Sequence, residues 1–480
     1  MYRAYTFLRI LFLPALFISV FGCQRTIYKS DVLIKNVNIV DIQTGTVTEG
    51  QSIAIKNDII IDIFDANSKT YEAVGEIDAT GKYAMPGLWD MHVHFRGGKD
   101  LEEFNRRMLP LYIAKGVTSV RDAGGDLTLP VISWKFLTSS RFIVGPRIYT
   151  SGPKLDGPDA RWEGSLEVSN QEEVNQALDS LQVLGVDYVK LYDSQLSGET
   201  YLSAIKETEK RGIKVTGHMP LGVLLDDAIE AGVDGIEHMY YIMKGCSSKE
   251  EEISKRFERG EIGFWAALEQ FLETYDEEKA QQVFQKLADN NVAVVPTLYI
   301  NRVLTYIHEE DHNQDPFLRY ISRKIIATYQ GRVEAAKNQS EAARAFRVNM
   351  LEKFKEMVPQ MHEAGVTILA GSDAGAYNSY VYPGEGLHGE LQLLSEVGLT
   401  NQQVLEIATM EGPLFFEKEN LFGAVQTSKY GDILVLNTNP LEDIKNLQDI
   451  FGVSFGSNFM TRDYLDGLLE RVRGQDFGGV

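Results

Sequence analysis

The sequence of 480 residues has little cysteine, little positive charge and no long apolar run beyond its N-terminus. Its 47 lysine and arginine residues stand against 68 aspartate and glutamate residues, which gives a formal net charge of −21. Such an acidic surface argues against nucleic acid as a partner, because phosphate backbones attract basic proteins. The charge mostly indicates solubility and says little about a substrate. No later segment approaches the length of a membrane span, and the sequence contains no repeat or low-complexity tract.

The N-terminus has the features of an export signal. Arg3 and Arg9 precede an apolar run over residues 10–22, which is too short to cross a membrane. The run ends in Val20-Phe21-Gly22-Cys23, which resembles a bacterial lipobox, although phenylalanine is bulkier than this pattern usually has. The resemblance implies cleavage before Cys23, lipidation of its sulfur and a lipid-anchored place in the bacterial cell envelope, at the outer membrane or facing the periplasm. An uncleaved N-terminal anchor is the alternative.

The scarcity of cysteine also limits how the chain is stabilised. Removal of residues 1–22 takes away two positive charges and leaves 458 residues with a formal net charge of −23. With Cys23 lipidated, Cys246 has no intramolecular disulfide partner. Stability must therefore come from a hydrophobic core, and a chain of this length can bury a large one.

The apolar pattern divides the rest of the chain into three pieces. Residues 31–85 show short strands with turn signals, at 32–40, 52–55 and 59–64. From residue 88 to about residue 373, strand patterns alternate with helical ones. A helical stretch near 402–409 then precedes a further strand at 432–436.

The middle piece has the pattern of a (β/α)8 barrel. About 290 residues with eight strand–helix units suit this fold. Ser169 and Glu172 form a capping-box pattern at the start of one helix. The acidic stretch 247–289 is long for one unit and predicts an inserted helical excursion. The eight predicted strands are at 88–93, 117–121, 147–150, 188–191, 214–217, 235–237, 292–295 and 366–370.

Residues that can bind metal fall on five of these strands. His92 and His94 end the first strand and, being two residues apart, share one of its faces. Each such residue alone is more often an ordinary polar group, but active sites of these barrels lie at the carboxyl edge of the strands. The set therefore predicts a metal centre. Its other members are Lys190 within the fourth strand, His218 at the end of the fifth, His238 at the end of the sixth and Asp373 at the end of the eighth.

The motifs resemble those of the amidohydrolase superfamily, in its imidazolonepropionase-like and dipeptidase-like branch. The resemblance covers essentially all of the mature chain. It implies a (β/α)8 TIM barrel over residues 86–421 and a small β-sandwich domain made of residues 23–85 together with 422–480. The motifs that carry it are Pro86-Gly87, Gly116-Val117-Thr118-Ser119-Val120-Arg121-Asp122, Gly371-Ser372-Asp373 and Gly431-Asp432-Ile433-Leu434-Val435-Leu436.

The resemblance also implies two divalent metal ions, usually zinc. The two histidines of the first strand would bind one ion with Asp373, and the histidines of the fifth and sixth strands would bind the other. Lys190 would bridge both ions as a carbamate formed with carbon dioxide. Burial near cations would favour the neutral amine that this reaction requires. A hydroxide shared by the ions would attack a carbonyl, and Asp373 would pass the proton to the leaving nitrogen.

Other residues near the predicted site have less specific patterns. His388 lies in a His-x-Glu-Leu sequence that the family often has close to the site, so it either faces the substrate or begins a helix. Tyr192 shares a strand face with Lys190 and either lines the pocket or packs at the end of the barrel. Arg121 and Asp122 either support the ligands or form a structural ion pair. The histidines expected at the solvated surface are His308, His312 and His362.

The predicted activity is metal-dependent hydrolysis of a carbon–nitrogen bond, amide or cyclic amide, in a small molecule. An envelope metallo-dipeptidase of the Xaa-Pro or Xaa-Arg type is an alternative. Such enzymes often carry a tyrosine two residues after the histidine of the fifth strand, where this chain has Pro220. A lactonase or esterase is a further alternative, since the same hydroxide attacks esters. A non-catalytic envelope scaffold would be expected to lose ligands, which argues against it, and the oligomeric state stays open.

Overall fold

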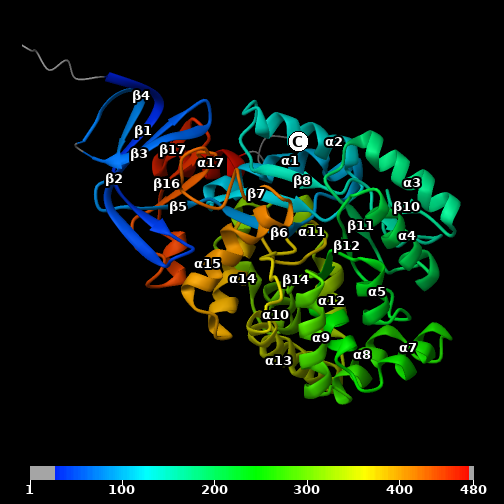
Figure 1. The fold of residues 1–480 in the computed structure, drawn as a ribbon. Helices are drawn as coiled ribbons and strands as arrows, with labels where there is room; N and C mark the ends of the chain where they lie inside the picture. Colours follow the sequence, from blue (N-terminus) through cyan, green and yellow to red (C-terminus); the bar gives the residue numbers. More distant parts are fainter. Residues whose placement is uncertain (1–26, 67, 475–480) are drawn as a thin grey trace, which may run out of the picture.

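The computed structural model describes residues 27–66 and 68–474, which form a sheet domain and an α/β domain (Figure 1). The predicted signal peptide, residues 1–22, and the predicted lipidation site Cys23 lie outside the described residues. None of the helices in the described part of the chain is long and apolar enough to cross a membrane.

Both ends of the described chain contribute strands to one eight-stranded sheet. Its order is β17-β16-β15-β5-β1-β2-β3, and β4 also pairs with β1. The strands are β1 (Ile27–Asp41), β2 (Thr46–Lys56), β3 (Ile59–Asp65), β4 (Thr70–Asp78), β5 (Tyr83–Pro86), β15 (Ile433–Leu436), β16 (Ile450–Phe455) and β17 (Asn458–Thr461).

The long strand β1 holds this sheet together. Its first half pairs in parallel with β4, whereas Asn38 and Ile39 pair with β5, and its other edge runs antiparallel to β2. Because side chains alternate along a strand, Leu33 and Ile34 face opposite sides and pack in separate apolar clusters. Strand β15 pairs antiparallel with β5, so the C-terminal part of the chain completes a sheet that the N-terminal part begins.

The α/β domain contains two parallel sheets, with the orders β6-β7-β8 and β10-β9-β11-β12-β13-β14. Most of these strands are short and buried throughout, as is usual where helices cover a parallel sheet. Asp187 N donates a hydrogen bond to Thr150 O at 2.9 Å, which links the two sheets. The strands are β6 (Leu88–Val93), β7 (Val117–Asp122), β8 (Arg147–Thr150), β9 (Leu155–Asp156), β10 (Leu166–Glu167), β11 (Val189–Leu191), β12 (Val215–Gly217), β13 (Gly235–Glu237) and β14 (Ala293–Val295).

The segment 366–374 lies between β14 and β6 and differs from the strand predicted at 366–370. It makes only isolated bridges, from Ile368 to Val294 and from Ala374 to Val93. Regular backbone pairing is interrupted at Ser372, because Ser372 N donates its hydrogen bond to the Asp90 carboxylate at 2.9 Å rather than to a backbone carbonyl.

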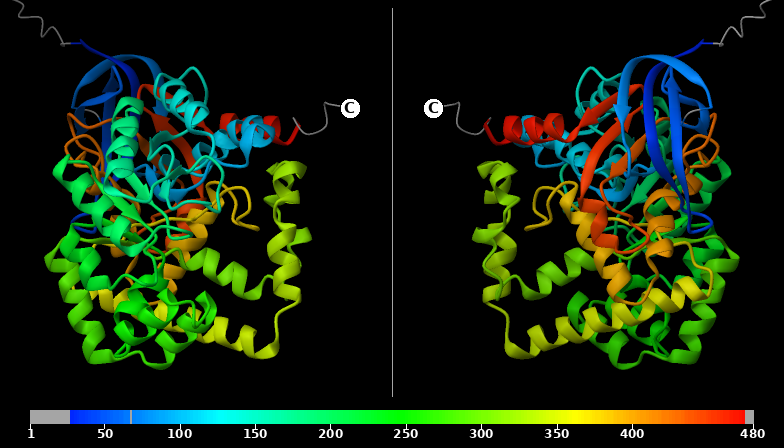
Figure 2. Two further views of the ribbon diagram at one scale, coloured as in Figure 1. Left: turned by 90° about the vertical axis from the view of Figure 1, so that its right-hand side faces the viewer. Right: turned by 90° about the vertical axis from the view of Figure 1, so that its left-hand side faces the viewer.

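Helices surround the parallel strands (Figure 1), and Figure 2 shows the yellow-green part of the chain, around residues 320–340, along one side of the molecule. The α-helices before β14 are α1 (Gly98–Ala114), α2 (Thr128–Ser139), α3 (Gln171–Leu184), α4 (Gly198–Lys210), α5 (Leu225–Ala231), α6 (Met239–Gly245), α7 (Glu250–Glu258), α8 (Phe264–Glu273) and α9 (Glu277–Asp289). Those after it are α10 (Leu298–Tyr306), α11 (Arg323–Ala327), α12 (Gln330–Lys337), α13 (Glu341–Glu363), α14 (Glu385–Glu396), α15 (Asn401–Thr409), α16 (Glu411–Phe415) and α17 (Arg462–Gly474). The 3-10 helices are η1 (His312–Gln314), η2 (Leu318–Tyr320) and η3 (Ile444–Gln448).

Most of the helices predicted around the parallel strands form at or near the expected residues. The predicted excursion over 247–289 forms α7, α8 and α9, and the predicted helix at 402–409 is α15. The capping residue of α3 is Asn170 rather than Ser169, since the Asn170 side chain accepts a hydrogen bond from Glu173 N at 3.1 Å. Strand β4 and helix α17 were not predicted. Residues of β4 alternate between exposed and half-buried, so the strand lacks the apolar signal of a buried one.

An ion pair joins β8 of the α/β domain to the sheet domain. Arg147 Nε donates to Asp432 Oδ2 at 2.6 Å, and its NH2 group donates to Oδ1 at 3.1 Å. The side chain of Asp432 is only 3% exposed. The guanidinium also lies 4.4 Å from the ring centroid of Tyr430, so aromatic packing holds the cation in place.

Replacement of Arg147 by methionine is expected to destabilise the fold strongly, because Asp432 would stay buried without its partner. The expected loss is about 3 kcal/mol in the free energy of unfolding, measured by urea denaturation. Lys255→Met is the matched control, since it removes an exposed partner of Glu251 and should cost under about 0.5 kcal/mol. Equal losses in the two variants would contradict this role of the ion pair.

Candidate metal centre

His92 and His94 lie at the C-terminal end of β6, and both are buried. His92 Nδ1 donates to Glu237 Oε2 at 2.6 Å, and His94 Nδ1 donates to Gly124 O at 2.9 Å. Because both partners are acceptors, a proton of each ring is assigned to Nδ1, which leaves Nε2 as the atom that can offer a lone pair to a metal. The two Nε2 atoms are 3.2 Å apart, so both lone pairs are directed to one place.

Asp373 adds a carboxylate to this pair. Its Oδ1 atom lies 3.1 Å from His94 Nε2 and 3.5 Å from His92 Nε2, and Asn378 Nδ2 donates to it at 2.6 Å. Burial opposes ionisation, but His92 and His94 hold the pKa of Asp373 well below its ordinary value. The carboxylate is therefore ionised at neutral pH, and these three side chains together could hold a cation.

A second histidine pair is formed by His218, which follows β12, and His238, which follows β13. Their Nε2 atoms are 3.1 Å apart. His218 Nδ1 donates to Asp193 Oδ1 at 3.1 Å, and His238 Nδ1 lies 2.7 Å from Thr297 Oγ1. Burial lowers the pKa of both rings well below the ordinary value for histidine. Both rings are therefore neutral, which is the form that binds a metal.

The two groups adjoin each other. The ring centroids of His92 and His238 are 5.0 Å apart. One ligand atom from each of His92, His238 and Asp373 lies within 4.8 Å of the others, and all three residues are buried. The structure thus brings four predicted histidines and the predicted aspartate to one region at the carboxyl ends of the parallel strands.

Lys190 lies in β11 and is completely buried. Its Nζ has no hydrogen-bond partner and is 3.5 Å from Glu237 Oε1. Burial lowers the pKa of Lys190 to about 8, against the attraction of Glu237. The amine of Lys190 is thus far more easily deprotonated than that of an exposed lysine. A buried nitrogen without a hydrogen-bond partner also destabilises the fold unless a further group bonds to it.

Glu237 is a central residue whose role the sequence does not predict. Arg121 NH2 donates to both of its carboxylate oxygens, at 2.8 and 2.9 Å, and Thr216 Oγ1 donates at 2.7 Å. Burial opposes ionisation, yet Arg121 and Lys190 hold the pKa of Glu237 well below its ordinary value. The carboxylate orients the ring of His92 and lies beside the Lys190 amine. An acidic residue within a short apolar strand was the available sequence signal.

Arg121 therefore supports a predicted ligand through Glu237 and does not pair with Asp122. The carboxylate of Asp122 instead accepts hydrogen bonds from Thr150 Oγ1 at 2.8 Å and from Phe95 N at 3.3 Å. Of the two alternatives for Arg121, support of the ligand set fits the observed contacts.

Backbone strain is concentrated in the same region. His238, Thr297 and Asp373 have φ angles of 69°, 49° and 59°, in the left-handed region that non-glycine residues rarely adopt. Each such residue costs on the order of 1–3 kcal/mol, which the surrounding structure must offset. These backbone conformations place the side chains of His238 and Asp373 in the cluster of histidines.

The two predicted substrate residues lie in different places. The ring of Tyr192 packs against His218, with centroids 4.3 Å apart, so Tyr192 borders the cluster. His388 is buried in α14, and its Nε2 donates to Lys115 O at 2.8 Å, at the end of α1. The structure does not bring His388 to the other histidines, so its contact with a substrate stays a prediction.

Two histidines expected at the surface are largely buried. The ring of His312 stacks on Tyr380 with centroids 4.1 Å apart, and His312 Nδ1 donates to Asp315 Oδ2 at 3.0 Å. The side chain of His308 is 9% exposed. The expectation was wrong because polar neighbours in sequence do not reveal that a distant loop, here the one that carries Tyr380, covers them.

Comparison with known proteins places this cluster in a family. The profile of the amidohydrolase family matches residues 83–458. An adenine deaminase from Ruegeria sp. is 28% identical over 192 residues, 39% of this chain and 32% of that protein, so the match spans about a third of the relative. An ochratoxinase from Aspergillus niger is 22% identical over 395 residues, 76% of this chain and 72% of the relative.

The fold has a solved counterpart as well. The crystal structure of a Xaa-Pro dipeptidase with bound methionine aligns with a TM-score of 0.67 at 20% identity, and the alignment covers 90% of this chain and 100% of the other. At this level of identity the likeness shows a shared, TIM-barrel-like fold. Because the family profile covers well over half of the sequence, including all six predicted ligands, this chain belongs to the amidohydrolase family.

Proposed function

We propose that the protein is a metal-dependent hydrolase that cleaves a carbon–nitrogen bond, in an amide or cyclic amide, of a small molecule. The convergence of two histidine pairs and an ionised aspartate at one edge of the strands carries this proposal. Family membership supports it, as do the names of the relatives, because a deaminase and a dipeptidase both act at carbon–nitrogen bonds.

We infer that the cluster holds two divalent metal ions, with zinc as the expected metal. His92, His94 and Asp373 would hold one ion, and the pair after β12 and β13 would hold the other. Neutral imidazoles and a carboxylate are the ligands that zinc prefers. When bound, the two ions would lower the pKa of a shared water toward ~7 and polarise a substrate carbonyl.

The orphaned Nζ of Lys190 fits a carbamate that bridges the two groups of ligands. The neutral amine would attack carbon dioxide, forming a nitrogen–carbon bond and releasing one proton. The product carries an anionic group with two oxygens, which would satisfy the buried atom and face both ligand groups. Burial favours this reaction because it disfavours the ammonium form.

Asp373 is the residue best placed to move protons. Its ionised carboxylate is held by Asn378 and stands beside the Nε2 atoms of His92 and His94. It would accept the proton of the attacking water and deliver that proton to the leaving nitrogen. The hydrogen bond that His92 Nδ1 donates to Glu237 keeps the His92 ring from rotating during the proton transfer.

We further propose that the α/β domain, over residues 86–421, is a closed (β/α)8 barrel. The segment 366–374 would act as its eighth strand, because Met91 N donates to Ala370 O at 2.7 Å and Asp373 N donates to His92 O at 2.7 Å. These two hydrogen bonds join the segment to β6, and the bridge from Ile368 to Val294 joins its other edge to β14. Residues 23–85 and 422–480 would form the accompanying sheet domain, as the sequence predicts.

The place of the protein in the cell is proposed from sequence alone. The export signal over residues 1–22 and the lipobox-like motif at Cys23 favour a lipid anchor in the bacterial cell envelope. A substrate would then be met outside the cytoplasm. Radiolabelled palmitate should be incorporated into the wild-type chain and not into Cys23→Ala.

A substrate screen with the zinc-loaded protein tests the proposed function directly. N-acyl amino acids, hydantoins and dipeptides offer carbon–nitrogen bonds, and lactones offer a carbon–oxygen bond in a similar setting. We expect turnover of at least one amide or cyclic amide and its loss in Asp373→Asn. Turnover confined to lactones would contradict cleavage of a carbon–nitrogen bond.

Metal content tests the ligand assignment. The purified protein is expected to hold about two divalent ions per chain by elemental analysis. His218→Asn should hold about one and lose activity by about 100-fold or more, since the missing ion contributes several kcal/mol to the transition state. The control is His362→Asn, a change in α13 outside the cluster, which should keep both ions. Less than one equivalent in the wild type, with Asp373→Asn fully active, would refute the mechanism.

The carbamate on Lys190 has a mass signature. Native mass spectrometry in bicarbonate buffer should show a mass increase of one carbon dioxide per chain, and 13C-bicarbonate should give a carbamate signal by NMR. Lys190→Met should lose both signals and weaken metal binding. An unmodified wild-type chain that still holds two ions would exclude the bridge.

A further inference from the structure

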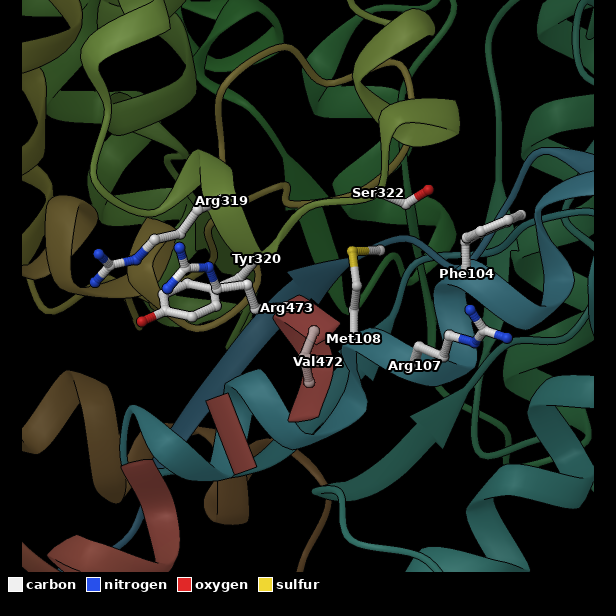
Figure 3. A pocket seen from close by; sticks show the side chains of 8 residues that line it. All are labelled: Phe104, Arg107, Met108, Arg319, Tyr320, Ser322, Val472 and Arg473. Atoms are coloured by element: carbon white, nitrogen blue, oxygen red, sulfur yellow. The ribbon is translucent and has the colours of Figure 1, made fainter. Parts of the chain in front are cut away.

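One pocket outside the described cluster is large enough for part of a small molecule. It has a volume of about 300 Å3 and lies among the loops that follow β6, β7 and β9 and the loop that carries Tyr377. Arg96 in its wall comes two residues after His94 along the chain. The pocket in Figure 3, between α1, η2 and α17, has only about 10 Å3, room for no more than one water.

Two buried cations line the larger pocket. Arg96 is 5% exposed and Lys154 is 2% exposed. Arg96 Nε donates to Ala376 O at 2.8 Å. Among residues 27–66 and 68–474, no carboxylate forms an ion pair with either cation. Burial lowers the pKa of Lys154 to about 7 although Asp122 and Asp126 attract it, so an anion bound in the pocket would favour its charged form.

The nearby acids are engaged elsewhere. The two carboxylate oxygens of Asp126 accept hydrogen bonds from Gly97 N at 2.9 Å and from Gly98 N at 2.8 Å. The exposed side chains of Arg161 and Glu163 lie at the rim and carry opposite charges. Asp126 therefore lines the pocket with its carboxylate oxygens bonded to the backbone and forms no ion pair with Arg96 or Lys154.

Aromatic rings hold both cations in position without neutralising them. The guanidinium carbon of Arg96 lies 4.5 Å from the ring centroid of Trp162. Lys154 Nζ is 5.4 Å from the same centroid and 5.0 Å from that of Tyr192, the ring that packs on His218. Tyr192 thus contacts both Lys154 and His218, which places the pocket beside the histidine cluster.

We infer that Arg96 and Lys154 bind a carboxylate of the substrate, and that the substrates are small amides with a free carboxylate near the scissile carbon–nitrogen bond. The reaction itself rests on the proposed function. An arginine fork binds a carboxylate through two hydrogen bonds, and a lysine that contacts the same indole ring adds a third donor. The indole ring that both side chains contact favours a planar or apolar group next to the carboxylate.

Binding measurements test this site without any catalysis. Titration calorimetry of the holoprotein should show that benzoate binds at least 10-fold more tightly than benzamide. Arg96→Gln and Lys154→Met should each remove this preference without a change in metal content. Lys210→Met is the control, because that lysine is exposed on α4 and pairs only with Glu207, and it should keep the preference. Equal binding of the two ligands, or a preference that survives in both variants, would overturn the inference.

Matched substrates test the same site in catalysis. For an N-acyl amino acid and its carboxamide, kcat/KM for the acid should fall about 10- to 100-fold in Lys154→Met, whereas kcat/KM for the carboxamide should stay within about 2-fold. An equal fall for both would show a general defect and overturn the inference. If benzoate binds as expected but no carbon–nitrogen bond is cleaved, the proposed function fails and the carboxylate site stands. If Arg96→Gln does not fold, Lys154→Met decides the result.

Discussion

The buried carboxylate of Glu237 is the group on which the candidate metal centre depends. It accepts hydrogen bonds from Arg121, His92 and Thr216 and lies beside Lys190, so it connects side chains from β6, β7, β11 and β12. A carboxylate can stay ionised away from water only when cations and donors surround it. The hydrogen bond from His92 orients one ring of the candidate metal site, and the charge of Glu237 attracts the nearby amine of Lys190.

The distribution of charge around this centre differs from that of the whole chain. The chain as a whole is strongly acidic, with a formal net charge of −21. Within the α/β domain, however, Arg96, Arg121, Lys154 and Lys190 are buried close to the strand ends, together with the acids Asp122, Glu237 and Asp373. Burial strengthens electrostatic interactions, because water no longer screens them. The arrangement of these buried charges therefore says more about a substrate than the net charge does.

The parts of the fold that could be predicted are those with strong local signals. The strands at 88–93, 147–150 and 235–237 have the predicted bounds, because a short apolar run between two helical patterns fits a buried strand and is too short for a helix. Strand β4 is only weakly amphipathic, and α17 begins directly after the hairpin of β16 and β17, with Thr461 accepting a hydrogen bond from Tyr464 N at its start. The segment 366–374 reads as a strand in sequence, but Asp90 and the left-handed turn at Asp373 interrupt regular pairing.

The sequence by itself determined which residues could be ligands, because the two-residue spacing of His92 and His94 and the strand-end positions of His218, His238 and Asp373 follow from local periodicity. Tertiary structure decided how they are used. The role of Glu237, the orphaned amine of Lys190 and the cationic pocket all depend on contacts between residues far apart in the chain. Local sequence specifies the direction of a side chain from its own strand, whereas its partner on another strand is set only when the strands pack together.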